Sequence, residues 1–252
     1  MLDVVGALVL GAMLAVETIV LIGWAAVRPA AKLVASIIAA AVISLLIGVG
    51  AAGGFATGAA GPVPAPVIAF AILLVGGLVA WFTSPKFRNA LLSVPLWGLV
   101  GTNVFRVVGV LFLVLHERGR LAAPFAISAA WGDIITGLAA IPVAAIAFRR
   151  GTVPGWLLGV WNAFGTLDLI TAVVLGGLSA PGTPFRVFTE APGTEAMGLL
   201  PWVLVPAFLV PLYLMTHFAI FMRLASERAA KREAIEHQVR PTSMRGAGPI
   251  YS

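Results

Sequence analysis

The chain has 252 residues, of which 60% are hydrophobic and only 10% are charged. A water-soluble domain of this length cannot bury so large an apolar fraction, so the composition excludes a soluble globular protein and indicates a membrane protein. The absence of cysteine excludes disulfides, thiolate metal sites and thiol nucleophiles. The net charge of +6 comes mostly from basic residues in short connections between apolar runs, which indicates membrane topology and argues against nucleic-acid binding.

Seven apolar runs are long enough to cross a bilayer as helices, since a span needs about 20 residues at a rise of about 1.5 Å each. The first run has no basic segment before it and is too long for a signal-peptide core, so we expect it to be retained. The sequence therefore predicts an all-α membrane protein with seven transmembrane helices. The runs cover residues 4–27, 33–52, 66–83, 91–115, 124–148, 155–178 and 199–222.

The basic residues predict how the seven helices are oriented. Twelve of the 16 Lys and Arg residues fall in the first, third and fifth connections or after the last run. Only Arg118, Arg120 and Arg186 fall on the other side, and Arg106 lies within a run. The positive-inside rule therefore predicts an outside N-terminus and a cytoplasmic C-terminus, in a multi-pass protein of the cell inner membrane.

Two regions follow from this pattern, a bundle over residues 1–223 and a cytoplasmic region over residues 224–252. Residues 223–239 are rich in Ala, Glu, Lys and Arg, which favours a basic helix that extends the last span. Residues 240–252 contain Pro and Gly without apolar periodicity, so we expect a loose tail. The longest outer connection, residues 179–198, could cap the outer end of the bundle, but we favour a simple surface loop.

Three charged residues define the candidate site. Arg106, Asp133 and Asp168 each lie nine or ten residues from the expected outer end of consecutive helices, which places all three roughly 13–15 Å deep. A charge facing lipid alone costs about 2.5–3.5 kcal/mol. We therefore expect Arg106 to lie between the two carboxylates, bound by two hydrogen bonds to one of them and shared with the other.

Other polar residues extend this centre. Asn103 and Thr136 lie one helical turn from Arg106 and Asp133, and Asn162 shares a helix with Asp168, so these six residues form the predicted substrate- or ion-binding set. With both aspartates ionised the charges of the three residues sum to −1, so a bound proton or cation would neutralise the site. The sequence does not decide which aspartate titrates. The alternative is a salt-bridge network that only fixes helix packing.

A second polar layer is expected nearer the cytoplasm, roughly 20–27 Å from the outer edge. It contains Glu17, Tyr213 and His217, with Asn162 at a similar depth. No residue on its own helix pairs with Glu17. We expect it either to reach His217 or Asn162, or to hold its proton and form a hydrogen bond.

Several cofactors are disfavoured by the residues. Retinal needs a lysine in the middle of the seventh run, and Lys32, Lys86 and Lys231 all lie at cytoplasmic edges. A bis-histidine haem is disfavoured because His116 and His217 differ by about 25 Å in depth. With one histidine in the bundle, no metal site is expected. A haem with one histidine ligand, or a quinone held by His217 or Arg106, stays open.

Three classes of function fit these observations. The first is a membrane protein that binds or transports a small solute, a proton or a cation at the charged centre. The second is a cofactor- or lipid-binding redox or enzymatic protein that uses the same region with His217. The third is a structural or accessory subunit with a membrane-protein partner or as a homo-oligomer. The residues do not decide whether the protein is an enzyme, and the partners expected in every class include the lipid bilayer but no nucleic acid.

Overall fold

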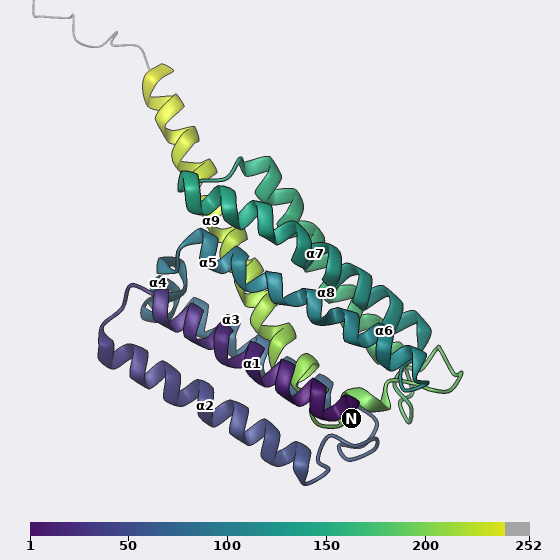
Figure 1. The fold of residues 1–252 in the computed structure, drawn as a ribbon. Coiled ribbons are helices and arrows are strands. Elements are labelled where there is room, and N and C mark those ends of the chain that lie inside the picture. The colour runs from purple at the N-terminus through teal and green to yellow at the C-terminus, as the bar shows by residue number, and fades with distance from the viewer. Residues whose placement is uncertain (240–252) are drawn as a thin grey trace, which may run out of the picture.

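The computed structural model describes residues 1–239, which form helices and the connections between them (Figure 1). Seven helical segments are long and apolar enough to cross a membrane, which confirms the predicted number of spans. Five of the spans are single helices, and the fourth and seventh are built from shorter pieces. The single helices are α1 (Leu2–Trp24), α2 (Pro29–Ala51), α3 (Ala65–Thr83), α7 (Ala123–Arg150) and α8 (Gly155–Leu178).

The fourth span is irregular. It consists of α5 (Leu96–Gly101), the 3₁₀-helical segment η1 (Thr102–Gly109) and α6 (Val110–Glu117). The expected start at residue 91 is wrong, because residues up to 93 belong to the separate short helix α4 (Pro85–Ser93). Val94 is extended, as expected for a residue that precedes a proline, and this breaks the helix between α4 and α5.

The seventh span starts at residue 205, later than the expected residue 199. Residues 199–203 form turns, and the span then runs through the π-helical segment η3 (Val205–Leu209) into α9 (Val210–Val239). Prolines cause the delay, since Pro206 has no N–H for the carbonyl of Trp202, which accepts from the N–H of Val205 at 3.0 Å instead. Beyond the bundle α9 continues as one projecting helix (Figure 1). Residues 240–252, for which we expected a loose tail, lie outside the described residues.

The packing is dense around α7 and sparse around α2. The most extensive contacts between elements join α7 to η1 and to α8. In contrast, α2 lies at the edge of the bundle beside α1, and Leu46 is its only buried residue (Figure 1). The charged residues predicted from the sequence lie on the densely packed elements.

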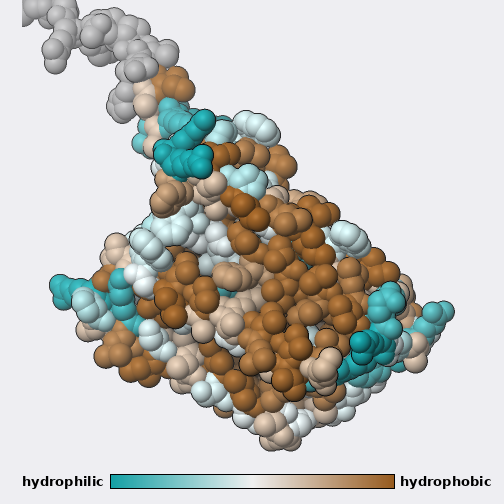
Figure 2. Space-filling model, in the orientation of Figure 1, coloured by the Kyte–Doolittle hydropathy of each residue, from teal (hydrophilic) through white to brown (hydrophobic). Residues whose placement is uncertain are grey.

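The outer faces of the bundle are apolar. Figure 2 shows hydrophobic side chains over the middle of the face in view and hydrophilic ones toward the two ends of the helices. Large apolar side chains such as Leu8, Ile72 and Leu167 are exposed on these faces. Because a soluble protein rarely exposes so wide an apolar surface, we interpret these faces as the surface that contacts lipid.

Candidate functional site

Arg106 is the centre of a buried polar cluster. It projects from η1, is 2% exposed, and donates through Nε to Asp133 Oδ1 at 2.7 Å and through Nη2 to Asp168 Oδ2. Its Nη1 donates to the carbonyl of Gly165 at 3.2 Å and lies 3.2 Å from Nε2 of His217. A guanidinium has five N–H donors, and four of them here face acceptors on α7, α8 and α9. Arg106 therefore ties the fourth, fifth, sixth and seventh spans together.

The tautomer of His217 follows from its neighbours. Because Nε2 faces an N–H donor of Arg106, this nitrogen must accept, and the ring proton is therefore on Nδ1. Nδ1 then donates to Oδ1 of Asn162 at 2.8 Å, and Nδ2 of Asn162 donates to the carbonyl of His217 at 3.0 Å. If His217 were an imidazolium, its Nε2–H would face an N–H group of Arg106, and neither could accept. The hydrogen bonds thus define a neutral imidazole, so Arg106 supplies the positive charge of the cluster and the two aspartates are the groups that can carry negative charge.

Two glycines let the charged helices approach. A methyl group at Gly109 of η1 would lie 2.6 Å from the Cβ atom of Asp133, and one at Gly132 of α7 would collide with the carboxylate of Asp168. No side chain fits at either point without moving an aspartate. Small residues that allow close helix contact are common in membrane bundles, and here they place both carboxylates within reach of Arg106.

Glu17 and Tyr213 form a second buried pair next to the cluster. The Tyr213 hydroxyl donates to Oε1 of Glu17, and the ring of Tyr213 lies 5.7 Å from the guanidinium carbon of Arg106. Glu17 is 0% exposed, and its Oε2 has no hydrogen-bond partner among the described residues. Of the interactions that we expected for Glu17, neither contact with His217 nor contact with Asn162 is present.

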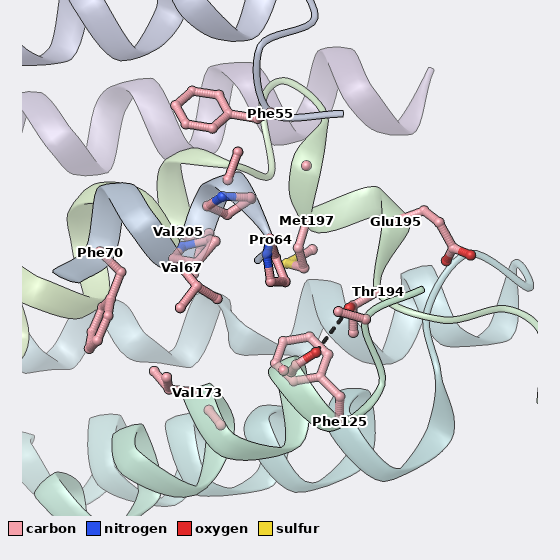
Figure 3. Close-up of a pocket in the computed structure, with 18 of the residues that line it drawn as sticks. Phe55, Pro64, Val67, Phe70, Phe125, Val173, Thr194, Glu195, Met197 and Val205 are labelled. Atoms are coloured by element: carbon pink, nitrogen blue, oxygen red, sulfur yellow. Dashed lines mark hydrogen bonds between the residues drawn. The ribbon is translucent and has the colours of Figure 1, made fainter. Parts of the chain in front are cut away.

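A cavity of about 110 Å³ reaches Asp133 from the end of the bundle at which the N-terminus lies. Its walls come from α3, α6, α7, α8, η3 and the start of α9 and from two connections, and Figure 3 shows Phe55, Phe70, Phe125 and Val173 around it. Among the described residues, Asp133 is the only charged one that lines it deep in the bundle, and Glu195 lies at its margin. The side chain of Asp133 is 16% exposed. Its second carboxylate oxygen, Oδ2, accepts no hydrogen bond from the described residues.

A second, smaller cavity of about 30 Å³ is also lined by Asp133. It is lined by Arg106, Asp133 and Tyr213 as well as by apolar residues. A space of this size holds one or two water molecules, and polar groups on its wall supply hydrogen bonds for them. Both cavities are lined by Asp133, and Tyr213, the partner of Glu17, lines the smaller one.

The connection 179–198, expected to be a simple surface loop, forms part of the cavity. Its final segment, including η2 (Glu195–Gly198), is held in place because the carbonyl of Gly193 accepts from the N–H of Ala122 at 2.9 Å. The Thr194 hydroxyl also donates to the carbonyl of Gly176 at 3.0 Å, the dashed bond in Figure 3. This segment forms one wall of the cavity, so the connection takes the capping position that the sequence left open as the alternative to a surface loop.

Of the predicted binding set, two residues lie outside the charged cluster. Asn103 is fully buried, but its Nδ2 donates to the carbonyl of Leu99 at 3.1 Å and its Oδ1 has no partner among the described residues. The hydroxyl of Thr136 is also buried, likewise without a partner in residues 1–239, while its backbone carbonyl accepts from Trp161 Nε1 at 3.1 Å. The other four, Arg106, Asp133, Asp168 and Asn162, are linked by hydrogen bonds directly or through His217.

The depth that we expected for His217 and Asn162 needs correction. Both belong to the Arg106 cluster and not to a separate layer nearer the cytoplasm. The estimate for His217 counted from residue 199, whereas the span starts at residue 205, which brings His217 to about 18 Å from the start of the span. Tyr213 and Glu17 lie directly beside the cluster as well.

The residues present give little support to a metal or haem. Among the described residues, no three His, Asp or Glu side chains are grouped so that they could hold a metal ion. A haem ligand needs a free imidazole nitrogen, and both nitrogens of His217 are engaged, one with Arg106 and one with Asn162. The arrangement is instead suited to holding a proton or a positively charged group at the free oxygen of Asp133.

Fold and site define the chain as an integral membrane helical bundle with a buried arginine and buried carboxylates. It belongs to the family described as Domain of unknown function (DUF8737), which matches residues 63–225. The matched residues include Arg106, Asp133, Asp168 and His217, whereas Glu17 precedes them. No curated protein and no solved structure matches the chain.

Proposed function

We propose that this protein is a multi-pass protein of the cell inner membrane that binds and transports a small solute, a proton or a cation at Arg106, Asp133 and Asp168. The observation that carries the proposal is the cavity that leads from one end of the bundle to Asp133, whose Oδ2 accepts no hydrogen bond from the described residues. An ion-pair network that served packing alone would have no need of such access. Ionisable groups within membrane spans commonly mark the path of an ion or substrate.

The charge of the cluster favours a positively charged occupant. One guanidinium and two carboxylates sum to −1 when both aspartates are ionised, and the neutral His217 adds nothing. A proton or a cation at Asp133 would cancel this excess. Asn162 supports the site indirectly, since it fixes the tautomer of His217 that accepts from Arg106.

The helices around the cluster resemble those that transporters use at their binding sites. Arg106 lies on the 3₁₀-helical segment η1, and the cavity is lined by Val205 and Pro206 of the π-helical segment η3. Discontinuous or irregular helices near the middle of the membrane supply binding groups in many transporters. Irregular segments beside a cavity therefore support a transport role.

We propose the orientation that the positive-inside rule predicts, with the N-terminus outside and α9 projecting into the cytoplasm. Its support is that α4 and the end of α7 carry Lys86, Arg88, Arg149 and Arg150, while the cavity is lined by connections at the opposite ends of the helices. In this orientation the cavity opens outward and the solute enters from outside.

The test is flux through proteoliposomes that contain the purified full-length protein, under an imposed gradient of protons, sodium or potassium. We expect flux that depends on the protein and that Asp133→Asn and Asp168→Asn abolish, because each removes a negative charge from the site. Glu190→Gln, which alters an exposed carboxylate in the connection 179–198, is the matched control and should retain flux. Wild-type flux in both aspartate variants would exclude the site from the function.

An accessory role is a second candidate, and the sparse packing of α2 favours it. A helix with one buried residue leaves most of its surface for lipid, for another membrane protein or for a second copy of this chain. This candidate predicts that a second membrane protein co-purifies in fixed ratio from the native membrane. A solitary, monodisperse bundle would exclude it.

A further inference from the structure

The charged groups that line the open cavity are all acidic. Asp133 lies at its inner end, and Glu195 lies at the margin of the lining residues (Figure 3). Among the described residues, no Lys, Arg or His lines this cavity. Arg106 lines only the smaller cavity beyond Asp133, where its N–H groups are committed to carboxylates, a carbonyl and a histidine. An anion entering the open cavity would meet carboxylates alone.

The wall between the two carboxylates is apolar and aromatic. Four phenylalanines line it, and the rings of two of them, Phe112 and Phe125, pack with their centroids 5.7 Å apart. The face of an aromatic ring attracts a cation, and groups of aromatic residues are a common means of binding ammonium groups. A strongly hydrated inorganic ion would gain little from such a wall, because phenylalanine offers no oxygen to replace its water. The four residues are Phe55, Phe70, Phe112 and Phe125.

The size of the cavity limits the apolar part of the ligand. A closed apolar cavity of about 150 Å³ accommodates one benzene molecule, and the cavity here measures about 110 Å³ and is partly open. A short branched alkyl group therefore fits inside, and one aromatic ring fits with part of it in the opening. The free oxygen Oδ2 of Asp133 is then the acceptor for the charged end.

We infer that the ligand of this site is a small organic cation: an ammonium group that binds Asp133, joined to an apolar body that contacts the phenylalanines. This inference rests on the proposed function and specifies the class of solute. Thr194 contributes to the shape of the cavity but does not recognise charge, because its hydroxyl already donates to the carbonyl of Gly176. Entry past Glu195 would concentrate cations at the opening before they reach Asp133.

Three probes of one shape test this inference: benzylamine, which is a cation at neutral pH, benzyl alcohol, which is neutral, and benzoate, which is an anion. Calorimetric titration of the detergent-purified full-length protein should rank the affinities in that order. We expect Asp133→Asn to lower the affinity for benzylamine at least about tenfold, since a charge-assisted hydrogen bond is lost. The affinity for benzyl alcohol should change little in this variant.

A second variant covers the case in which Asp133→Asn does not fold. Phe125→Leu keeps an apolar side chain but removes the aromatic face, and it should weaken benzylamine about two- to fivefold while leaving benzyl alcohol nearly unchanged. Phe148→Leu, an exposed phenylalanine outside the cavity, is the matched control and should bind all three probes like the wild type.

Four outcomes would overturn the inference. Benzoate binding as tightly as benzylamine would contradict the charge preference, and equal binding of benzylamine and benzyl alcohol would indicate an apolar pocket that does not recognise charge. If benzylamine does not bind but proton, sodium or potassium flux depends on Asp133, the ligand is not an organic cation, and the proposed function stays intact. If neither binding nor flux depends on Asp133, both proposals fail.

Discussion

Two buried acidic sites lie on either side of Tyr213 and differ in how their charge is balanced. Asp133 and Asp168 each accept an N–H of Arg106, so both can be ionised. Glu17 accepts only the Tyr213 hydroxyl, and its second oxygen has no partner among the described residues. An ionised carboxylate buried without a cation is costly, so Glu17 is expected to hold a proton. In this bundle the neighbouring group decides whether a buried acid carries charge.

The largest effect should come from removing the shared cation. Arg106→Ala leaves two carboxylates buried without a partner, and breaking a buried ion pair in this way costs about 3–5 kcal/mol. We expect low yield and a markedly lower melting temperature in detergent. The triple variant Arg106→Met, Asp133→Asn, Asp168→Asn should recover much of the stability, because no unpaired charge remains. Wild-type melting of Arg106→Ala would contradict the ion-paired description of this site.

A medium effect is expected from Gly132→Ala, which leaves all charges present but separates them. The added methyl group would collide with the carboxylate of Asp168, which must move away from Arg106. Forcing an extra methyl group into a close-packed contact costs about 1–3 kcal/mol. Gly76→Ala is the control, since a methyl group there meets no atom within 4 Å. Equal melting temperatures for the two variants would show that Asp168 does not need this close approach.

The smallest effect is expected at the second site. Glu17→Gln replaces a neutral acid with a neutral amide of similar shape, so the change in unfolding free energy should stay within about 1 kcal/mol. Infrared spectroscopy should also show that the variant lacks one carbonyl band of a protonated carboxyl group. A loss of stability comparable to that of Arg106→Ala would mean that Glu17 is ionised, and the contrast between the two sites would be wrong.

Helical rise was sufficient to predict that Arg106, Asp133 and Asp168 share a depth, because each could be counted from the end of a span. The same count failed for His217, since the last span begins at residue 205, where Pro206 lacks the N–H that an α-helix would offer to the carbonyl of Trp202. Neither the close approach of Gly132 to the side chain of Asp168 nor the cavity could be predicted from the sequence. Both depend on how helices distant in sequence pack, and the cavity also depends on a connection whose fold is set by hydrogen bonds to Ala122 and Gly176.

The 3₁₀-helical form of η1 has a consequence for the geometry of the fourth span. A 3₁₀-helix rises about 2.0 Å per residue and turns about 120°, against about 1.5 Å and 100° for an α-helix. The eight residues of η1 are therefore about 4 Å longer than the same residues would be in α-helical form. A change of this segment to α-helical form would shorten the fourth span and at the same time rotate Arg106 about the helix axis. The arginine that joins four spans is thus carried by a segment in which length and rotation are coupled.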